Sequence, residues 1–379
     1  MKWERLAIED LCLKVTSGGT PLRSRTEFYE GGTIPWIKTK EVNFNRIYDA
    51  DEKITEKGLD NSSAKLIPEN SILIAMYGDG HTAGRCAINR LPVTTNQACC
   101  NLVINPDKAN PDYMFYKIST LYEVFKGLKS GGSQQNLNAK TLKEFQVQIP
   151  PLHTQRKIAS ILSAYDDLIE NNLKRIKLLE EKAFLMYKGI VREEKFSQKA
   201  FNEVADYING YPFKPDDWKD EGLPIIKIKE LKAGVQSDTP RNDGENISEK
   251  YFIENKDILF AWSASIGAYL WCSGKSILNQ HIFNVKPFDK DLHNWLYFSL
   301  LEKIPDFINL SNGATMQHIK KSALGMVYLP VPPKKVYEEF QKETEPILNL
   351  IVNLNQQNTK LREARDILLP NLMNRQIEV

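Results

Sequence analysis

Three polar side chains in the second half of the sequence have the types and order of a magnesium-dependent nuclease. Asp216 follows a proline, and Glu230 and Lys232 are separated by one residue, which matches the loose pattern Pro-Asp…(Asp/Glu)-x-Lys. The carboxylates of such a site hold Mg²⁺, which prefers oxygen ligands. The pattern is short and is expected by chance in many chains, and the similar segment WIKTKEV (36–42) lacks the Glu-x-Lys order. A nuclease that uses Asp216, Glu230 and Lys232 is therefore kept as an alternative function.

Two other segments resemble enzyme motifs only in part. Residues 110–113 read Asn-Pro-Asp-Tyr and lack the second proline of the Asn-Pro-Pro-Tyr motif of adenine methyltransferases, so a turn that caps the next helix is the simpler interpretation. The glycines of segment 77–84 are too few and too irregularly spaced for a phosphate-binding loop, and the sequence has no G-x-x-x-x-G-K-[ST] motif. The five histidines do not have the spacing of metal ligands. We therefore predict no catalytic residue, no metal site and no cofactor in this chain.

Composition is that of an ordinary soluble protein of two or three domains, with 379 residues, 42% apolar and 26% charged. The sequence has no run of about 18 apolar residues, which argues against a membrane span, and acidic residues near its start argue against a secretion signal. The cysteines are odd in number and include no Cys-x-x-Cys, which argues against disulfides and zinc and predicts a cytoplasmic location. They are Cys12, Cys86, Cys99, Cys100 and Cys272.

The chain repeats itself once. Four weakly similar segment pairs occur in the same order, at an offset that drifts only from about 189 to about 181 residues. A solenoid would have shorter periods and more copies, so we infer two copies of one domain-sized unit. The pairs are 33–42 with 223–231, 67–75 with 253–261, 95–103 with 278–286, and 131–151 with 312–333.

Each copy ends in a Pro-Pro pair that is followed by a long segment with apolar residues at a period of 3.5, which is the pattern of a coiled-coil seam. Pro346 should kink the second helix or mark its first turn, and Pro370 should weaken or end it. The seam positions are Ile158, Leu162, Tyr165, Ile169, Asn172, Ile176, Leu179, Ala183, Met186 and Ile190 in the first helix, and Phe340, Thr344, Ile347, Ile351, Leu354, Asn358, Leu361, Arg365, Leu368 and Leu372 in the second.

The segments before the helices contain short β-branched or aromatic runs separated by Gly, Asn and Asp, which indicates strands and turns. The predicted fold is therefore α+β: two similar strand-rich, mixed α/β domains separated by an antiparallel coiled coil of two long helices, with a pseudo-two-fold axis. The predicted domains are 1–150 and 196–333, and the predicted helices are 151–195 and 334–379.

The two helices should bury their stripes against each other. We choose the antiparallel register in which facing positions sum to 530, because it places Asn172 against Asn358, the only asparagines of the seam. A buried asparagine that faces another can fix register at some cost in stability. From 158 to 190 the seam spans about 50 Å, and one turn of B-DNA is about 34–36 Å, so the two domains could contact DNA half-sites about one turn apart.

The ordered set of motifs resembles the DNA specificity subunits of type I restriction–modification systems. The resemblance spans essentially the whole chain in the two-repeat layout of that family, and the ordered set is more specific than any one motif. The matching segments are IPWIKTKEV, PENSIL and IENKDIL, TNQ and LNQ, GGSQQNL and GATMQHI, each Pro-Pro pair with its long helix, and the ending LLPNLMNRQIEV (368–379).

This resemblance implies that two target-recognition domains each read half of a split, asymmetric site in double-stranded DNA. It implies that the helices act as a ruler and dock methyltransferase (modification) subunits, two in number, which bind S-adenosylmethionine and methylate adenine. ATP-dependent restriction subunits that use Mg²⁺ would cut DNA. The second copy has KKVYEEF (334–340) where the first has LHTQRKI (152–158) with Gln155, which leaves open whether both copies present equal docking surfaces.

On this resemblance, base-reading side chains are expected on loops beside the strands, because Lys and Arg pair with guanine and Asn and Gln with adenine. The alternative is that the basic residues form solvated faces and that Tyr77 and Trp262 belong to the core. With 50 basic and 48 acidic residues, the chain should bind DNA weakly by itself. The candidates are Arg23, Arg25, Lys38, Lys40, Tyr77, His81 and Arg85 in the first copy, and Tyr211, Lys227, Lys229, Trp262, Ser263 and Ser265 in the second.

Some polar residues recur in both copies, namely the pairs Asn96-Gln97 and Asn279-Gln280. Residues that read two different sequences need not repeat, so recurrence favours a scaffold role, although base reading stays open for these four. The same logic makes Gly132 and Gly313 turn residues.

The preferred prediction is a non-catalytic DNA-recognition subunit of a type I restriction–modification complex. Two alternatives are the Mg²⁺-dependent nuclease described above and a coiled-coil scaffold that binds only proteins.

Overall fold

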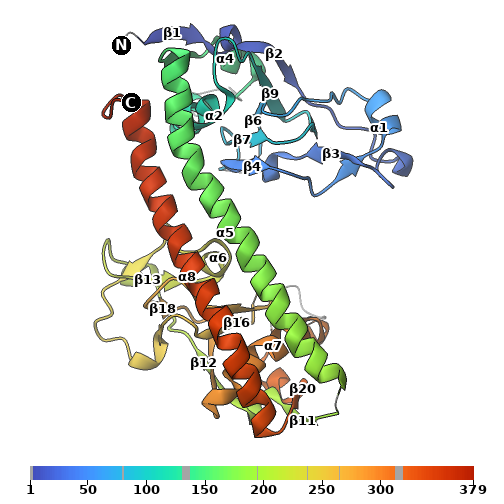
Figure 1. Cartoon of the computed structure of the whole chain (residues 1–379), viewed down its shortest axis with the longest axis vertical. Helices are drawn as coiled ribbons and strands as arrows, with labels where there is room; N and C mark the ends of the chain where they lie inside the picture. Colours follow the sequence, from blue (N-terminus) through green and yellow to red (C-terminus); the bar gives the residue numbers. More distant parts are fainter. Residues whose placement is uncertain are drawn as a thin grey trace. The chain divides into compact units, whose positions relative to one another are not determined.

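The computed structural model describes residues 3–78, 81–129, 137–193, 195–236, 238–263, 265–311 and 319–379 (Figure 1). It divides into two compact units, which are described separately. The first unit comprises Met1–Asp167 and Glu363–Val379, and the second comprises Leu168–Arg362. Each unit holds one strand-rich domain and a part of both long helices, α5 (Leu152–Glu193) and α8 (Lys334–Met373).

The first unit contains a five-stranded sheet, a three-stranded sheet and an antiparallel pair next to the start of α5. In order across each sheet, the strands are β2 (Cys12–Ser17), β9 (Cys99–Ile104), β6 (Ile72–Ala75), β7 (Cys86–Asn89) and β4 (Asn45–Ile47); β5 (Lys53–Ile54), β3 (Ile34–Ile37) and β8 (Thr94–Thr95); and β1 (Glu4–Ala7) with β10 (Gln146–Ile149). The α-helices of its domain are α1 (Glu56–Asp60), α2 (Pro111–Ser119), α3 (Tyr122–Lys129) and α4 (Ala139–Glu144).

The second unit is built on the same plan from a different sequence. In order across each sheet, its strands are β12 (Ala205–Asn209), β19 (Ile282–Pro287), β16 (Ile258–Ala261) and β17 (Gly267–Leu270); β14 (Arg241–Asn242), β13 (Leu223–Ile226), β18 (Ser276–Leu278) and β15 (Phe252–Ile253); and β11 (Ser197–Ala200) with β20 (Tyr328–Val331). The α-helices of its domain are α6 (Ile228–Ala233) and α7 (His293–Ser311).

The repeat predicted from the sequence is visible in the backbone. The strand β3 pairs with β8 in parallel, and β13 pairs with β18 in parallel. The residue that follows each second strand then donates its N–H to the end of the first: Asn96 to the carbonyl of Ile37, and Asn279 to the carbonyl of Ile226, both at 3.0 Å. Two segments of low sequence identity therefore fold into the same hydrogen-bonded frame.

The long helices begin close to the predicted positions, α8 ends six residues before the predicted end at 379, and the two prolines of α8 lie inside it. The helix α5 has 42 residues and α8 has 40. Because α8 begins at Lys334, Pro346 does not mark its first turn, and Pro370 does not end it, since the helix continues to Met373. A proline inside a helix costs about 3 kcal/mol. Burial of Phe340 and Leu348 on either side of Pro346 offsets that cost.

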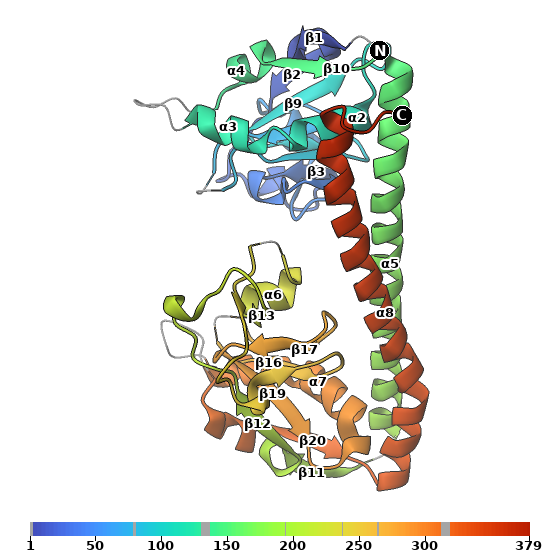
Figure 2. The same ribbon diagram turned by 90° about the vertical axis from the view of Figure 1, so that its left-hand side faces the viewer.

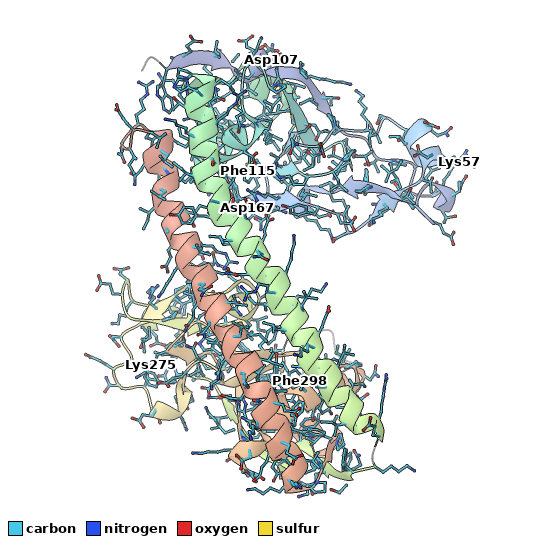
Figure 3. All side chains as sticks on the ribbon, in the orientation of Figure 1. Lys57, Asp107, Phe115, Asp167, Lys275 and Phe298 are labelled. Atoms are coloured by element: carbon cyan, nitrogen blue, oxygen red, sulfur yellow. The ribbon has the colours of Figure 1, made fainter. Side chains whose placement is uncertain are left out.

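An aromatic cluster joins the strand-rich domain of the second unit to both long helices. The ring centroid of Tyr187 on α5 lies 4.8 Å from that of Trp295 on α7, and the Phe340 ring on α8 lies 5.3 Å from Trp295. Phe298 of α7, labelled in Figure 3, lies 5.8 Å from Phe340. Within this unit α5 and α8 lie side by side (Figure 1 and Figure 2). They are antiparallel, because Tyr187 near the end of α5 contacts Phe340 near the start of α8, whereas Asn172 earlier in α5 contacts Asn358 later in α8.

The asparagine pair forms in the register that the sequence predicts. The side-chain N–H of Asn172 donates to Oδ1 of Asn358 at 3.0 Å, and both residues are buried. The seam around them includes the buried Ile176, Ile351 and Leu354. Nδ2 of Asn358 has no hydrogen-bond partner in the described part of the chain, so the pair leaves one polar atom unsatisfied. Such an atom costs about 1–3 kcal/mol.

The seam residues of the first unit pack against its strand-rich domain. Ile158, Leu162 and Leu372 are buried in one core, with Leu368 partly buried against it. The remaining predicted seam positions differ in burial: Ile169 is buried, and Leu179 and Leu361 are half-buried.

Arg365 forms an ion pair with the aspartate that follows the tyrosine set opposite it by the predicted register. The register places it opposite Tyr165, but its Nη1 lies 2.6 Å from Oδ1 of Asp166. The hydroxyl of Tyr116 on α2 donates to the other oxygen of this carboxylate. A charged group at a partly buried position needs an opposite charge, and the neighbouring aspartate supplies it.

A glutamine links each long helix to its own domain. Oε1 of Gln155 accepts from the N–H of Asn110 at 2.9 Å, and its Nε2 donates to the carbonyl of Pro150. In the second unit Oε1 of Gln341 accepts from the N–H of Asn294 at 3.0 Å. The departure at KKVYEEF therefore moves this kind of contact about one helical turn along α8 and does not remove it. Gln155 is buried, so it serves its own domain and does not form an outer surface.

No helix within the described ranges combines the length and the apolar character needed to cross a membrane.

We predict that Asn172→Leu lowers the thermal unfolding midpoint, because Asn358 then loses the hydrogen bond that Asn172 donates while it stays buried. The double variant Asn172→Leu/Asn358→Leu should unfold at or above the wild-type temperature, since two apolar side chains replace a pair with an unsatisfied atom. Scanning calorimetry of both variants measures this. A double variant that is less stable than the single variant would show that the buried asparagine pair does not carry the free-energy cost of an unsatisfied polar atom.

Candidate nucleic-acid interface

Three basic candidates of the first unit gather around two carboxylates. Nη1 of Arg23 lies 2.7 Å from Oε2 of Glu52, and Nζ of Lys38 lies 2.8 Å from Oε1 of the same residue. Nζ of Lys40 lies 2.8 Å from Oδ2 of Asp51. The hydrogen bond from Lys38 lowers the pKa of Glu52, and that from Lys40 lowers the pKa of Asp51. Both carboxylates therefore stay ionised at neutral pH, and the pairs are lost only as the pH falls through these lowered pKa values.

Aromatic rings hold the guanidinium of Arg23 in place. Its Cζ lies 4.5 Å from the ring centroid of Tyr29 and 4.6 Å from that of Trp36. The Trp36 ring is itself fixed, since its Nε1 donates to the carbonyl of Gly19 at 2.9 Å. Arg25 is less constrained: it lies 5.7 Å from the ring of Phe28, with a longer ion pair to Glu27. Arg23 is therefore the most rigidly oriented cation among these candidates.

The other candidates of the first unit lie on the hairpin between β6 and β7. Tyr77 is exposed, so it is not a core residue. His81 is exposed, and its carbonyl accepts from the hydroxyl of Tyr122 at 2.7 Å. The N–H of Arg85 donates to the carbonyl of Thr82, which closes the loop.

In the second unit an exposed tryptophan lies beside a candidate lysine. Nζ of Lys227 lies 4.3 Å from the ring centroid of Trp218, and Trp218 is 45% exposed. Lys229 forms an ion pair with Asp238 at 2.5 Å. Tyr211 lies edge-on to an aromatic neighbour, Tyr251, with ring centroids 5.4 Å apart.

The remaining candidates occupy the hairpin between β16 and β17, which is the counterpart of the β6–β7 hairpin. Trp262 packs against Phe283, with ring centroids 5.9 Å apart, and is partly buried on the core of the second unit. Ser263 is also buried. Oγ of Ser265 accepts from Nζ of Lys232 at 2.9 Å, which joins the hairpin to α6. Trp262 therefore fits a packing role, whereas Ser265 lies on the surface with Lys232.

The structure thus brings Arg23, Lys38 and Lys40 together in one unit, and joins Ser265 to α6 in the other. Sequence reasoning did not select Glu52 or Trp218 for this surface. Neither belongs to a repeated motif, and each becomes significant only through the side chain that it contacts in the fold. The signal for Trp218 was its place among the charged residues of segment 214–221, where a core tryptophan is unexpected.

The recurring asparagines have structural roles. Asn279 is buried, and Oδ1 of Asn96 accepts from the thiol of Cys99. Oε1 of Gln97 accepts from the hydroxyl of Thr20. These contacts connect the loop after each second strand to neighbouring segments, which supports the scaffold interpretation for them. Gly132 and Gly313 lie outside the described residues.

The carboxylate of the nuclease pattern is used as a helix cap. Glu230 is 2% exposed, and its Oε2 accepts from the N–H of Lys227 at 3.0 Å. Glu41 of the first unit makes the same contact with the N–H of Lys38 at 3.0 Å. Within the described ranges, no group of three or more His, Cys, Asp or Glu residues lies close enough together to hold a metal ion. The recurrence of this cap in both units explains Glu230 without catalysis.

The family comparison decides the identity of this repeated frame. The family model described as "Type I restriction modification DNA specificity domain" matches residues 1–181 and again residues 193–364. The chain belongs to this family. It is a type I restriction–modification specificity subunit, the non-catalytic component that recognises DNA, and not an enzyme.

Similar proteins support the assignment over the whole length. The type I restriction enzyme MjaIX specificity subunit of Methanocaldococcus jannaschii is 26% identical over 422 aligned positions, which cover 100% of this chain and 94% of the relative. The EcoR124I/EcoR124II specificity subunit of Escherichia coli is 29% identical over 202 positions, which cover 52% of this chain and 46% of the relative. The crystal structure of the S subunit from M. genitalium shares the fold, with a TM-score of 0.58, 16% identity, and coverage of 98% of this chain and 96% of that one.

We predict that Glu230→Ala lowers the free energy of unfolding of the specificity subunit by about 1 kcal/mol, because the N–H of Lys227 loses its cap. Glu230→Gln keeps an acceptor oxygen, so its free energy of unfolding should fall by less than that of Glu230→Ala. Glu41→Ala is the matched control in the first unit and should behave like Glu230→Ala. Thermal unfolding measures all three. Mg²⁺-dependent plasmid cleavage by the purified chain that disappears in Glu230→Gln would show the residue to be catalytic.

Proposed function

We propose that this specificity subunit reads a bipartite, asymmetric DNA site, with one half-site for each recognition domain, 1–150 and 196–333. The observation that carries the proposal is the repeated backbone frame with different exposed side chains. The pairings β3–β8 and β13–β18 agree, while the residues beside them, such as Arg23 and Trp218, do not. A frame that is used twice with different surface residues favours recognition of two different sequences.

The affinity for DNA comes largely from the assembled complex. The chain has a formal charge of only +2, and Arg23, Lys38, Lys40 and Lys229 are paired with carboxylates. Because non-specific affinity follows the number of phosphates that are neutralised, a chain with so small a net charge gains little affinity for DNA without its partners. The partners in this proposal are two methyltransferase subunits, which hold S-adenosylmethionine, and ATP-dependent restriction subunits, which use Mg²⁺.

The long helices supply a docking surface for the methyltransferase subunits. In the second unit, Leu178 and Leu185 of α5 are 64% and 68% exposed, and Leu168 is also exposed. Leu178 and Leu185 are seven residues apart, so they lie on one face of the helix, away from the buried seam. Exposed leucines in such a row are typical of a surface that a partner covers.

The first test is a footprint of the complex that contains the specificity and methyltransferase subunits, together with a map of adenine methylation in the treated DNA. We expect two protected blocks of different sequence, with an unread gap between them and methylated adenines within the blocks. The purified chain alone should protect neither block at physiological salt. A single protected block would contradict bipartite reading, and absence of any protection would favour the protein-only scaffold.

A second test changes the helices. Deletion of one heptad from both α5 and α8 shortens each by about 10 Å, or about three base pairs along DNA. We expect the gap in the methylated sequence to change while both half-site sequences stay the same. Deletion of four residues from each helix is the control, because it turns the apolar seam away from its partner and should abolish methylation. An unchanged gap in the heptad variant would show that the helices do not set the spacing.

A further inference from the structure

One lysine occupies the same place in both recognition domains. Lys38 follows Ile37 at the end of β3, and Lys227 follows Ile226 at the end of β13. Each lysine donates its backbone N–H to a glutamate three residues later, and the preceding isoleucine accepts from the recurring asparagine. The backbone frame therefore presents both lysines in the same way, whatever the surrounding sequence.

The groups beside these two lysines differ. Lys38 is 19% exposed and shares the carboxylate of Glu52 with Arg23, whose guanidinium lies over Trp36. Lys227 has the ring of Trp218 beside it. In the first domain the aromatic ring comes from the strand and a second cation comes from the preceding loop. In the second domain the preceding loop supplies the ring.

Contacts to DNA phosphates are the same for every sequence, whereas contacts to base edges must change with the sequence that is read. We infer that Lys38 and Lys227 contact the phosphate backbone of the two half-sites, while Arg23 reads a guanine in the first half-site and Trp218 contacts a base in the second. The inference rests on the proposed function and assigns roles within its two reading surfaces.

The geometry of Arg23 suits a guanine. A guanidinium has five N–H donors, and the ion pair with Glu52 engages Nη1. The side chain is 51% exposed, so other donors can face the O6 and N7 acceptors of a guanine. The rings of Tyr29 and Trp36 and the carboxylate of Glu52 fix its orientation before DNA binds, which lowers the entropy cost of the contact. Glu52 is thus a positioning residue, and Arg23 is the residue that touches DNA.

The experiment uses the complex of specificity and methyltransferase subunits on DNA that carries its methylation-mapped site. Each guanine of the first half-site is replaced in turn by 7-deazaguanine, which lacks the N7 acceptor. For the wild type we expect one replacement to weaken binding strongly. Arg23→Gln should weaken binding to the intact site by roughly 5- to 150-fold. At that position the variant should bind DNA with 7-deazaguanine as well as DNA with guanine. Every other position should keep its wild-type preference.

Glu52→Gln should weaken binding and reduce the preference for guanine at that same base pair. The double variant Arg23→Gln/Glu52→Gln should lose little more affinity than Arg23→Gln alone, because the two residues act as one unit. Trp218→Ala should relax the preference at one base pair of the second half-site and leave the first half-site unchanged.

The lysines should behave differently. Lys38→Ala and Lys227→Ala should each weaken binding to specific and unrelated DNA by the same factor, with unchanged base preference, and lower the slope of log affinity against log salt by about 1. Lys140→Ala in the first unit and Lys335→Ala in the second remove exposed lysines from other helices and serve as matched controls, with no expected change in affinity.

Two results would overturn the assignment while the proposed function stands. One is that Arg23→Gln weakens binding to all DNA sequences equally. The other is that Lys38→Ala changes the base preference without changing the slope of log affinity against log salt. A wild-type complex with no sequence preference would overturn the proposed function as well. Circular dichroism of each variant shows whether a loss of binding comes from misfolding, and Arg23→Lys provides a second variant that keeps the charge but loses the planar pair of donors.

Discussion

Burial of two apolar stripes along the long helices is the constraint on which this structure depends. A helix of about 40 residues with one apolar face gains most of its stability from packing and little from helix propensity alone. In the second unit α5 and α8 pack on each other and on α7 through Tyr187, Phe298 and Phe340. In the first unit Ile158 and Leu372 enter the core of the recognition domain. The same apolar residues therefore stabilise the helices and attach each domain to them.

Polar residues within this seam specify the register of the two helices at some cost in stability. Asn172 and Asn358 are buried with one nitrogen unsatisfied, and a pair of leucines would be expected to pack with less penalty. What the asparagines gain is discrimination between registers, because a shift by one heptad in either direction would separate the two amides and place one of them against an aliphatic side chain, Ile351 or Leu179. In the first unit, Asp166 of α5 and Arg365 of α8 form an ion pair.

In the two recognition domains, the residues that build the backbone frame are different from the exposed residues around it. Parallel strand pairs, the glutamate caps of Glu41 and Glu230, and the recurring asparagines build the same backbone in both units. The exposed positions around that frame carry unlike groups: a clamped arginine in one unit and an uncovered tryptophan in the other. A fold with this property can change its recognition surface without losing its core, since the substituted residues contribute little buried area.

The sequence alone determined the repeat, the two long helices, and the facing of Asn172 by Asn358, because each depends on spacing along one chain and on the need to bury an apolar stripe. It could not determine which candidates are exposed. Tyr77 and Trp262 have similar sequence settings, yet Tyr77 is exposed while Trp262 packs on Phe283. Nor could it show that α8 continues through Pro346, where tertiary packing outweighs the lost hydrogen bond. Only the tertiary structure places Glu52 against both Arg23 and Lys38, because side-chain pairing between distant segments follows from how the strands and loops meet in space.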